Sequence, residues 1–322
     1  MRFLVHRLLH SIFLLVGISL LSFAFLELAP GNFFDEMRLN PQISHDTLVH
    51  LEKQYGLDHS FAERYLAWVR SAVKGDWGVS FAYGSPVAPL IWTRARNTLL
   101  LTGLAMLLSW MIALPVGLLG AAERGRWLDN FFSLGTSLLL VTPDLLLALG
   151  LLWLALRTHW FPAGGMQSLS SSSAHADKLK DVAFHLMAPV AILVLGGLPV
   201  LVRHIRAAAI DALQQPCIRA ARSHGISRVR ILFRHGLPLA AAPLVSLFGF
   251  SLASLLSASL LVEVVMSWPG LGPLLLEAIL ARDVYLVIGA VMLAALFLAG
   301  GMLITDCLLF AADPRIRTEK LA

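Results

Sequence analysis

Charged residues are scarce in this chain. Asp, Glu, Lys and Arg together make up 14% of its 322 residues, whereas hydrophobic residues make up 57%. Soluble domains carry about 25% charged residues, so the composition excludes an ordinary globular protein and indicates an all-α polytopic membrane protein. The net charge of +5 does not indicate a nucleic-acid partner, because the basic residues cluster in short segments between apolar runs.

Cysteine is almost absent, and so are the usual motifs of catalysis. The two cysteines, Cys217 and Cys307, both fall on the side that we assign to the cytoplasm, so no disulfide is predicted. No Cys/His spacing is typical of a metal site, and the nucleotide-binding pattern G-x-x-x-x-G-K-[ST] does not occur. The sequence therefore predicts a protein that is not an enzyme, with no catalytic residue, metal or cofactor of its own.

Apolar stretches recur along the chain at lengths that suit membrane-spanning helices. Glycine and proline interrupt the fourth of them, which we expect to be a short, broken span. More than half of the 25 Lys and Arg residues lie in segments that this assignment places inside, so both termini are predicted to be cytoplasmic. The six predicted spans cover residues 8–29, 97–120, 130–156, 185–202, 238–262 and 284–310.

The first apolar stretch has no A-x-A-like cleavage site, so we expect a retained helix rather than a signal peptide. Residues 30–96 are polar enough to lie outside the membrane. They predict one helix from Ser44 to Gln54 and another that begins at a Ser60/Glu63 capping box and stops at Gly75. The expected division is therefore a tail and first span (1–29), an outer insertion (30–96) and a core of five further spans (97–322).

The most basic segment, residues 203–237, connects the fourth and fifth spans. Its arginines cannot lie in hydrocarbon, so it is predicted to be a cytoplasmic loop. Two short helices are expected around Gly225, which can adopt the left-handed conformation that ends a helix. The loop either docks on another protein or only holds anionic lipid headgroups. The candidate contact residues are Arg219, the small Ala220 and Ala221, Gly225, and the apolar Leu232 and Phe233.

Polar residues inside the predicted spans are the next candidates. Asp144 follows Pro143, which is expected to kink the third span. An acid at membrane depth suggests a functional role, but Asp144 could equally cap the half-helix that begins at Pro143. Ser251 and Ser254 belong to a stripe of small residues that either lines a translocation path or packs closely on a neighbouring helix.

Several phrases of the sequence carry a family resemblance. Arg219-Ala220-Ala221 is followed by Gly225 and a hydrophobic stretch that ends at Pro238; Tyr55-Gly-Leu-Asp, Gly75-Asp-Trp-Gly-Val-Ser and Ser267-Trp-Pro-Gly-Leu-Gly lie in the predicted outer segments. Together these phrases resemble the permease subunits of binding-protein-dependent ABC importers, in their oligopeptide/dipeptide branch. The last phrase is expected to form a glycine-rich turn with its tryptophan at the membrane interface. This turn is also a candidate re-entrant plug. Its residues are Trp268, Pro269, Gly270 and Gly272.

The resemblance implies a type I ABC importer permease fold with six transmembrane helices, located in the bacterial cytoplasmic (inner) membrane. It implies import of di- or oligopeptides delivered by a periplasmic or lipid-anchored binding protein. Two ATP-binding subunits would drive a homologous pair of permeases, and the loop around Gly225 would be the element that couples to them. Arg219 stands where many family members have glutamate. Nickel chelates, glutathione or antimicrobial peptides remain alternative cargoes.

A secondary transporter is the more distant alternative. It would need ionisable residues within its spans for proton or sodium coupling, and only Asp144 and Asp306 are candidates. The chain also shows no pair of broken helices that repeats across two halves.

Overall fold

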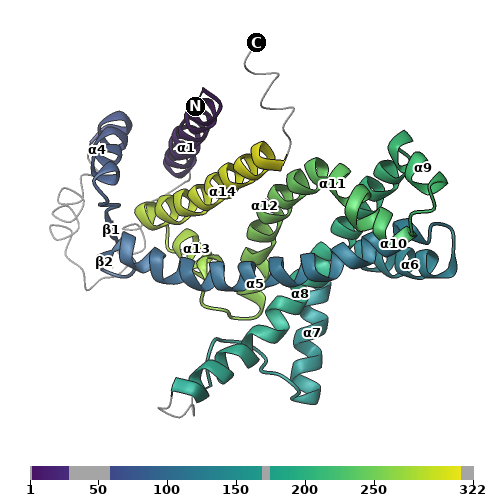
Figure 1. Cartoon of the computed structure of the whole chain (residues 1–322). Coiled ribbons are helices and arrows are strands. Elements are labelled where there is room, and N and C mark those ends of the chain that lie inside the picture. The colour runs from purple at the N-terminus through teal and green to yellow at the C-terminus, as the bar shows by residue number, and fades with distance from the viewer. Residues whose placement is uncertain (1, 29–58, 169–174, 313–322) are drawn as a thin grey trace. The chain divides into compact units, whose positions relative to one another are not determined.

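The computed structural model describes residues 2–28, 59–168 and 175–312 (Figure 1). The predicted helix from Ser44 to Gln54 lies outside these residues. Within them the chain is almost entirely helical. Five helices are long and apolar enough to cross a membrane, and a bent pair of helices provides a sixth span if it is counted as one. The all-α polytopic fold is therefore confirmed, with five or six candidate spans against the six predicted.

The spanning helices follow the predicted order, with shifted boundaries. They are α1 (Arg2–Leu28), α5 (Val87–Ala122), the bent pair α6 (Trp127–Val141) and α7 (Asp144–Thr158), α8 (His175–Leu213), α12 (Ala241–Val265) and α14 (Val284–Ala312). The remaining elements are α4 (Phe61–Val73), a hairpin of β1 (Val79–Ser80) and β2 (Ser85–Pro86), α9 (Pro216–Ser223), α10 (Arg228–Ile231), a π-helical turn (Leu232–Gly236), α11 (Leu237–Leu239) and α13 (Leu271–Leu280).

The fourth span differs from its prediction. It is not short and broken: α8 is a single helix of 39 residues that continues through Pro189 and Pro199. In lipid, an interrupted helix leaves backbone groups without hydrogen bonds, so neighbouring helices and local adjustments accommodate proline within a continuous helix. The middle of α8 is also surrounded by α6, α7 and α12, which pack against it.

The third span bends as expected at Pro143. The axes of α6 and α7 differ by 94°, a sharper break than the kink of one continuous helix. Thr142, directly before the proline, has extended backbone angles (φ −85°, ψ 115°). This conformation is expected because the proline ring excludes the helical region for the preceding residue. The break places the first turn of α7, with Asp144, within the middle of the chain's third apolar stretch.

The structure divides into two compact units. The first contains Met1–Asn97 and Pro269–Ala299, and the second contains Thr98–Trp268 and Gly300–Ala322. In the first unit, Phe23 of α1 packs against Trp68 of α4 and Ile288 of α14. The Ser60/Glu63 capping box that the sequence predicts is present at the start of α4, and Gly75 follows the helix with a left-handed φ of +88°.

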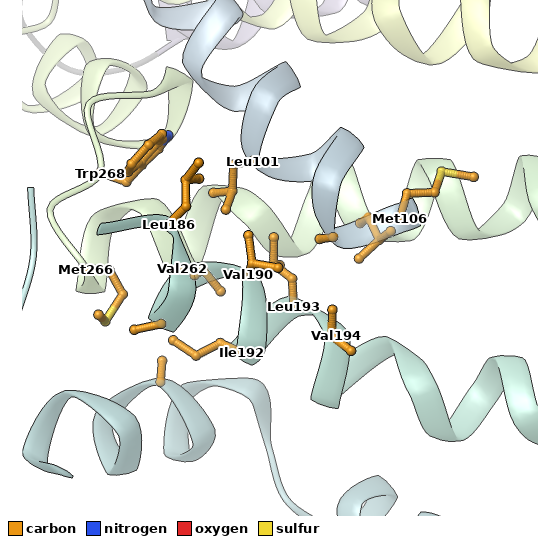
Figure 2. Close-up of a cluster of buried hydrophobic side chains, with 14 residues drawn as sticks. Leu101, Met106, Leu186, Val190, Ile192, Leu193, Val194, Val262, Met266 and Trp268 are labelled. Atoms are coloured by element: carbon orange, nitrogen blue, oxygen red, sulfur yellow. The ribbon is translucent and has the colours of Figure 1, made fainter. Parts of the chain in front are cut away.

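The second unit has its main core around α8. Buried side chains of α5, α8 and α12 meet there with Trp268 (Figure 2), which is fully buried. A further apolar cluster lies toward the other end of α8, where Val202 and Ile205 pack with Leu232 of the π-helical turn and Leu244 of α12. This second cluster includes Leu232 and so anchors that part of the basic loop to α8 and α12.

Candidate functional site

The basic loop folds as two short helical segments around Gly225. Pro216 occupies the first turn of α9, where its missing N–H is not needed. After α9, Gly225 takes a φ of +74°. Its N–H donates to the Arg222 carbonyl at 3.0 Å, and the Ile226 N–H donates to the Ala221 carbonyl at 3.3 Å. The left-handed turn that the sequence predicts at Gly225 is present in the structure, and it closes the end of α9.

Three of the six predicted contact residues lie on α9. Arg219 and Ala220 are exposed and Ala221 is half-buried, whereas Ile218 is fully buried and anchors the helix. Arg219 Nε donates to the Gln214 carbonyl at 3.3 Å. The helix therefore presents small side chains and two cations, Arg219 and Arg222, on its exposed surface, and the buried Ile218 fixes it to the chain.

Leu232 and Phe233 have different surroundings, although the sequence pairs them as groove-filling residues. Leu232 is 7% exposed and belongs to the chain's own core beside α8, whereas Phe233 is 57% exposed. Consecutive helical residues point about 100° apart, so one of the two can face inward while the other faces outward. The expectation for Leu232 is corrected: its side chain is not available to a partner, and Phe233 is the apolar group that the loop presents.

The three residues suggested for a translocation path line one cavity. Asp144 of α7 and Ser251 and Ser254 of α12 contribute to a space of about 70 Å³, which residues of α5 and α8 complete. The Ser251 hydroxyl is already engaged, because it donates to the Phe248 carbonyl at 2.8 Å and accepts from Trp110 Nε1 at 3.0 Å. Ser254 is exposed. Asp144 and Ser254 are therefore the polar groups of this set that remain available.

The alternative to a functional role was that Asp144 caps α7. The structure shows no such cap. Pro143 is the residue that precedes the helix, and it supplies no side-chain cap. In the part of the chain that the structure describes, the Asp144 carboxylate has no hydrogen bond or ion pair. Gly196 of α8 lies directly against it: a Cβ atom at that position would be 2.5 Å from Asp144 Oδ1. The absence of a side chain at Gly196 leaves room for the carboxylate.

The tryptophan of the Ser267–Gly272 phrase packs inside the protein, while its depth in the membrane and the re-entrant plug stay predictions. Trp268 is fully buried in the core of the second unit, and its backbone N–H donates to the Glu263 backbone carbonyl at 2.8 Å. The chain turns at Ser267, which has a φ of +50°. Gly270 is extended and precedes α13, and Gly272 is buried within that helix. The Pro269 carbonyl accepts a hydrogen bond from Asn97 Nδ2 at 2.7 Å.

Asp283 connects two sequence phrases that are far apart along the chain. It is fully buried and accepts from the Ser80 hydroxyl at 2.6 Å, the Ala82 N–H at 3.0 Å and the Leu286 N–H at 3.2 Å. The hairpin's Tyr83 also donates to Glu277 of α13, and this bond raises the pKa of the tyrosine. The hairpin is thus fixed to the α13–α14 turn. The sequence alone indicated no role for Asp283.

An ion pair between α6 and α8 was not predicted from the sequence. Arg206 donates from Nε to Asp129 Oδ1 at 2.6 Å and from a terminal nitrogen to Oδ2 at 2.7 Å. Asp129 is 4% exposed and accepts a third bond from the Gly125 N–H at 2.9 Å. Bidentate pairs of this kind fix orientation as well as adding energy. This pair holds the start of α6 against the end of α8 that leads into the basic loop.

Comparisons with known proteins decide the family. The model of the family described as "Binding-protein-dependent transport system inner membrane component" matches residues 113–318, and the model of its N-terminal part matches residues 1–102. The chain belongs to this family. The resemblance drawn from the loop and the outer phrases is therefore confirmed, and the protein is a permease subunit of an ABC importer rather than an enzyme.

Relatives of this permease match over its full length. The oligopeptide transport system permease protein AppB of Bacillus subtilis (strain 168) is 34% identical over 316 residues, which are 98% of each chain. The dipeptide transport system permease protein DppB of Escherichia coli (strain K12) is 30% identical over 339 residues, covering 99% of this chain and 100% of the relative.

A solved structure supports the fold. A chain of the MetNI methionine ABC transporter, in inward-facing conformations, matches with a TM-score of 0.58 at 19% identity; the match covers 70% of this permease and 96% of that chain. The type I importer permease fold is confirmed. As a family member with several apolar helices, the permease is a multi-pass protein of the cytoplasmic membrane, and it works with ATPase and substrate-binding partners.

Proposed function

We propose that this permease imports di- or oligopeptides. A binding protein would deliver the peptide, and a homologous second permease and two ATP-binding subunits would complete the transporter. The full-length similarity to relatives named as oligopeptide and dipeptide permeases supports this cargo. ATP is bound by the partner subunits, and this chain needs no cofactor of its own.

The observation that carries the coupling role is the construction of α9. Its buried Ile218 and the turn at Gly225 fix the helix, while Arg219 and Ala220 are exposed, as is Phe233 further along the loop. A lever must transmit force without deforming, so a short helix anchored on one face and exposed on the other suits a docking element. We propose that the ATP-binding subunit holds this face, and that closure of the two ATP-binding subunits moves it.

Cys217 offers a direct test, because it is exposed on α9. In a Cys307→Ser background, a membrane-impermeant thiol reagent is applied to right-side-out and inverted vesicles, with and without the ATP-binding subunits. We expect labelling in inverted vesicles alone, and its loss when the ATP-binding subunits are present. Labelling in right-side-out vesicles would overturn the cytoplasmic placement of the loop, and unprotected labelling in inverted vesicles would overturn the docking contact.

A further inference from the structure

The cavity beside Asp144 contains a single charged group. Among the residues that line it, Asp144 alone is charged, and the others are serines, glycines and apolar residues such as Ile192, Leu193 and Val262. The carboxylate accepts no hydrogen bond from any residue that the structure describes. Asp144 is exposed in the single chain, so its carboxylate is accessible to a cation or donor, and an acid at the depth of the spans calls for such a partner.

Ser109 is a second, independent polar group without a partner at this cavity. It lines the same cavity from α5 and is fully buried. Its Oγ atom has no hydrogen-bond partner. Buried hydroxyls are nearly always paired, so an unpaired one requires an explanation. One cavity thus borders an exposed carboxylate without a partner among the described residues and a buried, unpaired hydroxyl.

The position of the cavity along the helices makes an unpaired charge more costly. Gly196 and Gly197 lie near the middle of α8, and Ser251 and Ser254 lie near the middle of α12. The cavity is therefore far from both ends of these two spans. Acidic residues at such depth are rare and mark cargo or ion pathways. The N-terminus of α7, where Asp144 lies, favours a negative charge at this point.

The volume limits what the cavity can hold. A cavity needs about 10–15 Å³ to hold one water molecule, so a space of about 70 Å³ has room for a small polar group. The available polar partners, the Asp144 carboxylate and the Ser109 and Ser254 hydroxyls, all have lone pairs to offer. A primary ammonium group matches them, because it carries one positive charge and three N–H donors.

We propose that this cavity binds the terminal ammonium group of the cargo, with Asp144 as its counter-charge and Ser109 as a hydrogen-bond acceptor. The proposal rests on the import function above and adds the chemical group that the path recognises. A terminal ammonium is shared by peptides of every sequence. A site that binds this group would therefore accept di- and oligopeptides whatever their side chains are.

A pair of thiol reagents tests the site without transport. The full-length chain is assembled with its partner subunits in membranes, carrying Ser254→Cys with Cys217→Ser and Cys307→Ser. Rates of labelling are compared for 2-aminoethyl methanethiosulfonate, which carries a primary ammonium, and for the neutral methyl methanethiosulfonate. We expect Asp144→Asn to lower the ratio of the two rates about fivefold or more, the effect of one nearby charge even in a water-like dielectric.

Asp211→Asn is the matched control, because Asp211 lies on α8 but outside the cavity. It should leave the ratio of rates unchanged, while Ser109→Ala should lower it by less than Asp144→Asn does. A ratio that Asp144→Asn does not change would overturn the proposal. Methylammonium should also slow labelling by the neutral reagent, whereas tetramethylammonium, which has no N–H donor, should not. Equal protection by the two ions would likewise contradict the site.

Uptake by the whole transporter separates this site from the import function. Peptides with a free amino group are compared with their N-acetylated forms, in the wild type and in Asp144→Asn. If the labelling preference is found but no peptide is imported, the peptide function is wrong and the ammonium site stands. If both peptide forms are imported equally, with or without the Asp144 carboxylate, the ammonium site is wrong and the function stands.

Discussion

The turn at Gly225 gives the sharpest prediction about coupling. Its φ of +74° lies in the left-handed region, and a Cβ atom added there would meet nothing within 4 Å. Within the chain, an added Cβ atom therefore meets backbone strain and no steric clash. Left-handed geometry costs an L-residue roughly 1–2 kcal/mol, asparagine tolerates it better than most residues, and a β-branched residue tolerates it worst.

The loss of coupling should follow this strain. A strain of roughly 1–2 kcal/mol corresponds to a factor of about 5–30 in a two-state equilibrium, and docking weakens by the same factor if only the native turn binds. We expect Gly225→Asn to retain most uptake, Gly225→Ala to lose part of it, and Gly225→Val to lose nearly all. The assay measures peptide uptake and ATP hydrolysis in the same membranes, with the amount of inserted permease determined by immunoblotting.

Gly135→Ala is the matched control. Gly135 lies in α6, has no left-handed φ, and a Cβ atom there would also meet nothing within 4 Å. We expect normal uptake from this variant, because alanine is favoured over glycine in a helix. If Gly225→Val transports normally, or if Gly225→Asn fails as completely as Gly225→Val, then strain at the turn does not control coupling.

Three further outcomes are expected. Leu232→Ala should lower the free energy of unfolding by about 2–5 kcal/mol in thermal denaturation, whereas Phe233→Ala should leave stability unchanged and weaken binding of the ATP-binding subunit; the reverse pattern would refute the assignment of inward and outward faces. Asp129→Asn should lower stability by about 1–3 kcal/mol, because a charged hydrogen-bonded pair is broken, and an unchanged melting temperature would contradict this. Hydrogen bonds from Ser60 lower the pKa of Glu63, so the capping box should stabilise α4 fully above the pKa of the unfolded state and lose that effect as pH falls through the lowered pKa. Limited proteolysis of the outer segment across this acidic range should show the loss in the wild type and not in Ser60→Ala.

The sequence by itself determined the features that depend on neighbouring residues. Long apolar runs specify spanning helices, because the bilayer satisfies no backbone hydrogen bonds. Proline at position 143 specifies the bend between α6 and α7, glycine at 225 specifies the left-handed turn, and the Ser60/Glu63 pair specifies the start of α4. Each of these follows from chemistry within a few positions of one residue.

Tertiary structure decided what depends on contacts between distant residues. The continuity of α8 through two prolines, the burial of Trp268 and the inward direction of Leu232 come from neighbouring helices. The Asp129–Arg206 pair and the cavity beside Asp144 likewise join residues from different helices. Hydropathy ranks every apolar residue alike, whichever way its side chain points. Only the packed helices distinguish a residue that supports the fold from one that meets a partner or cargo.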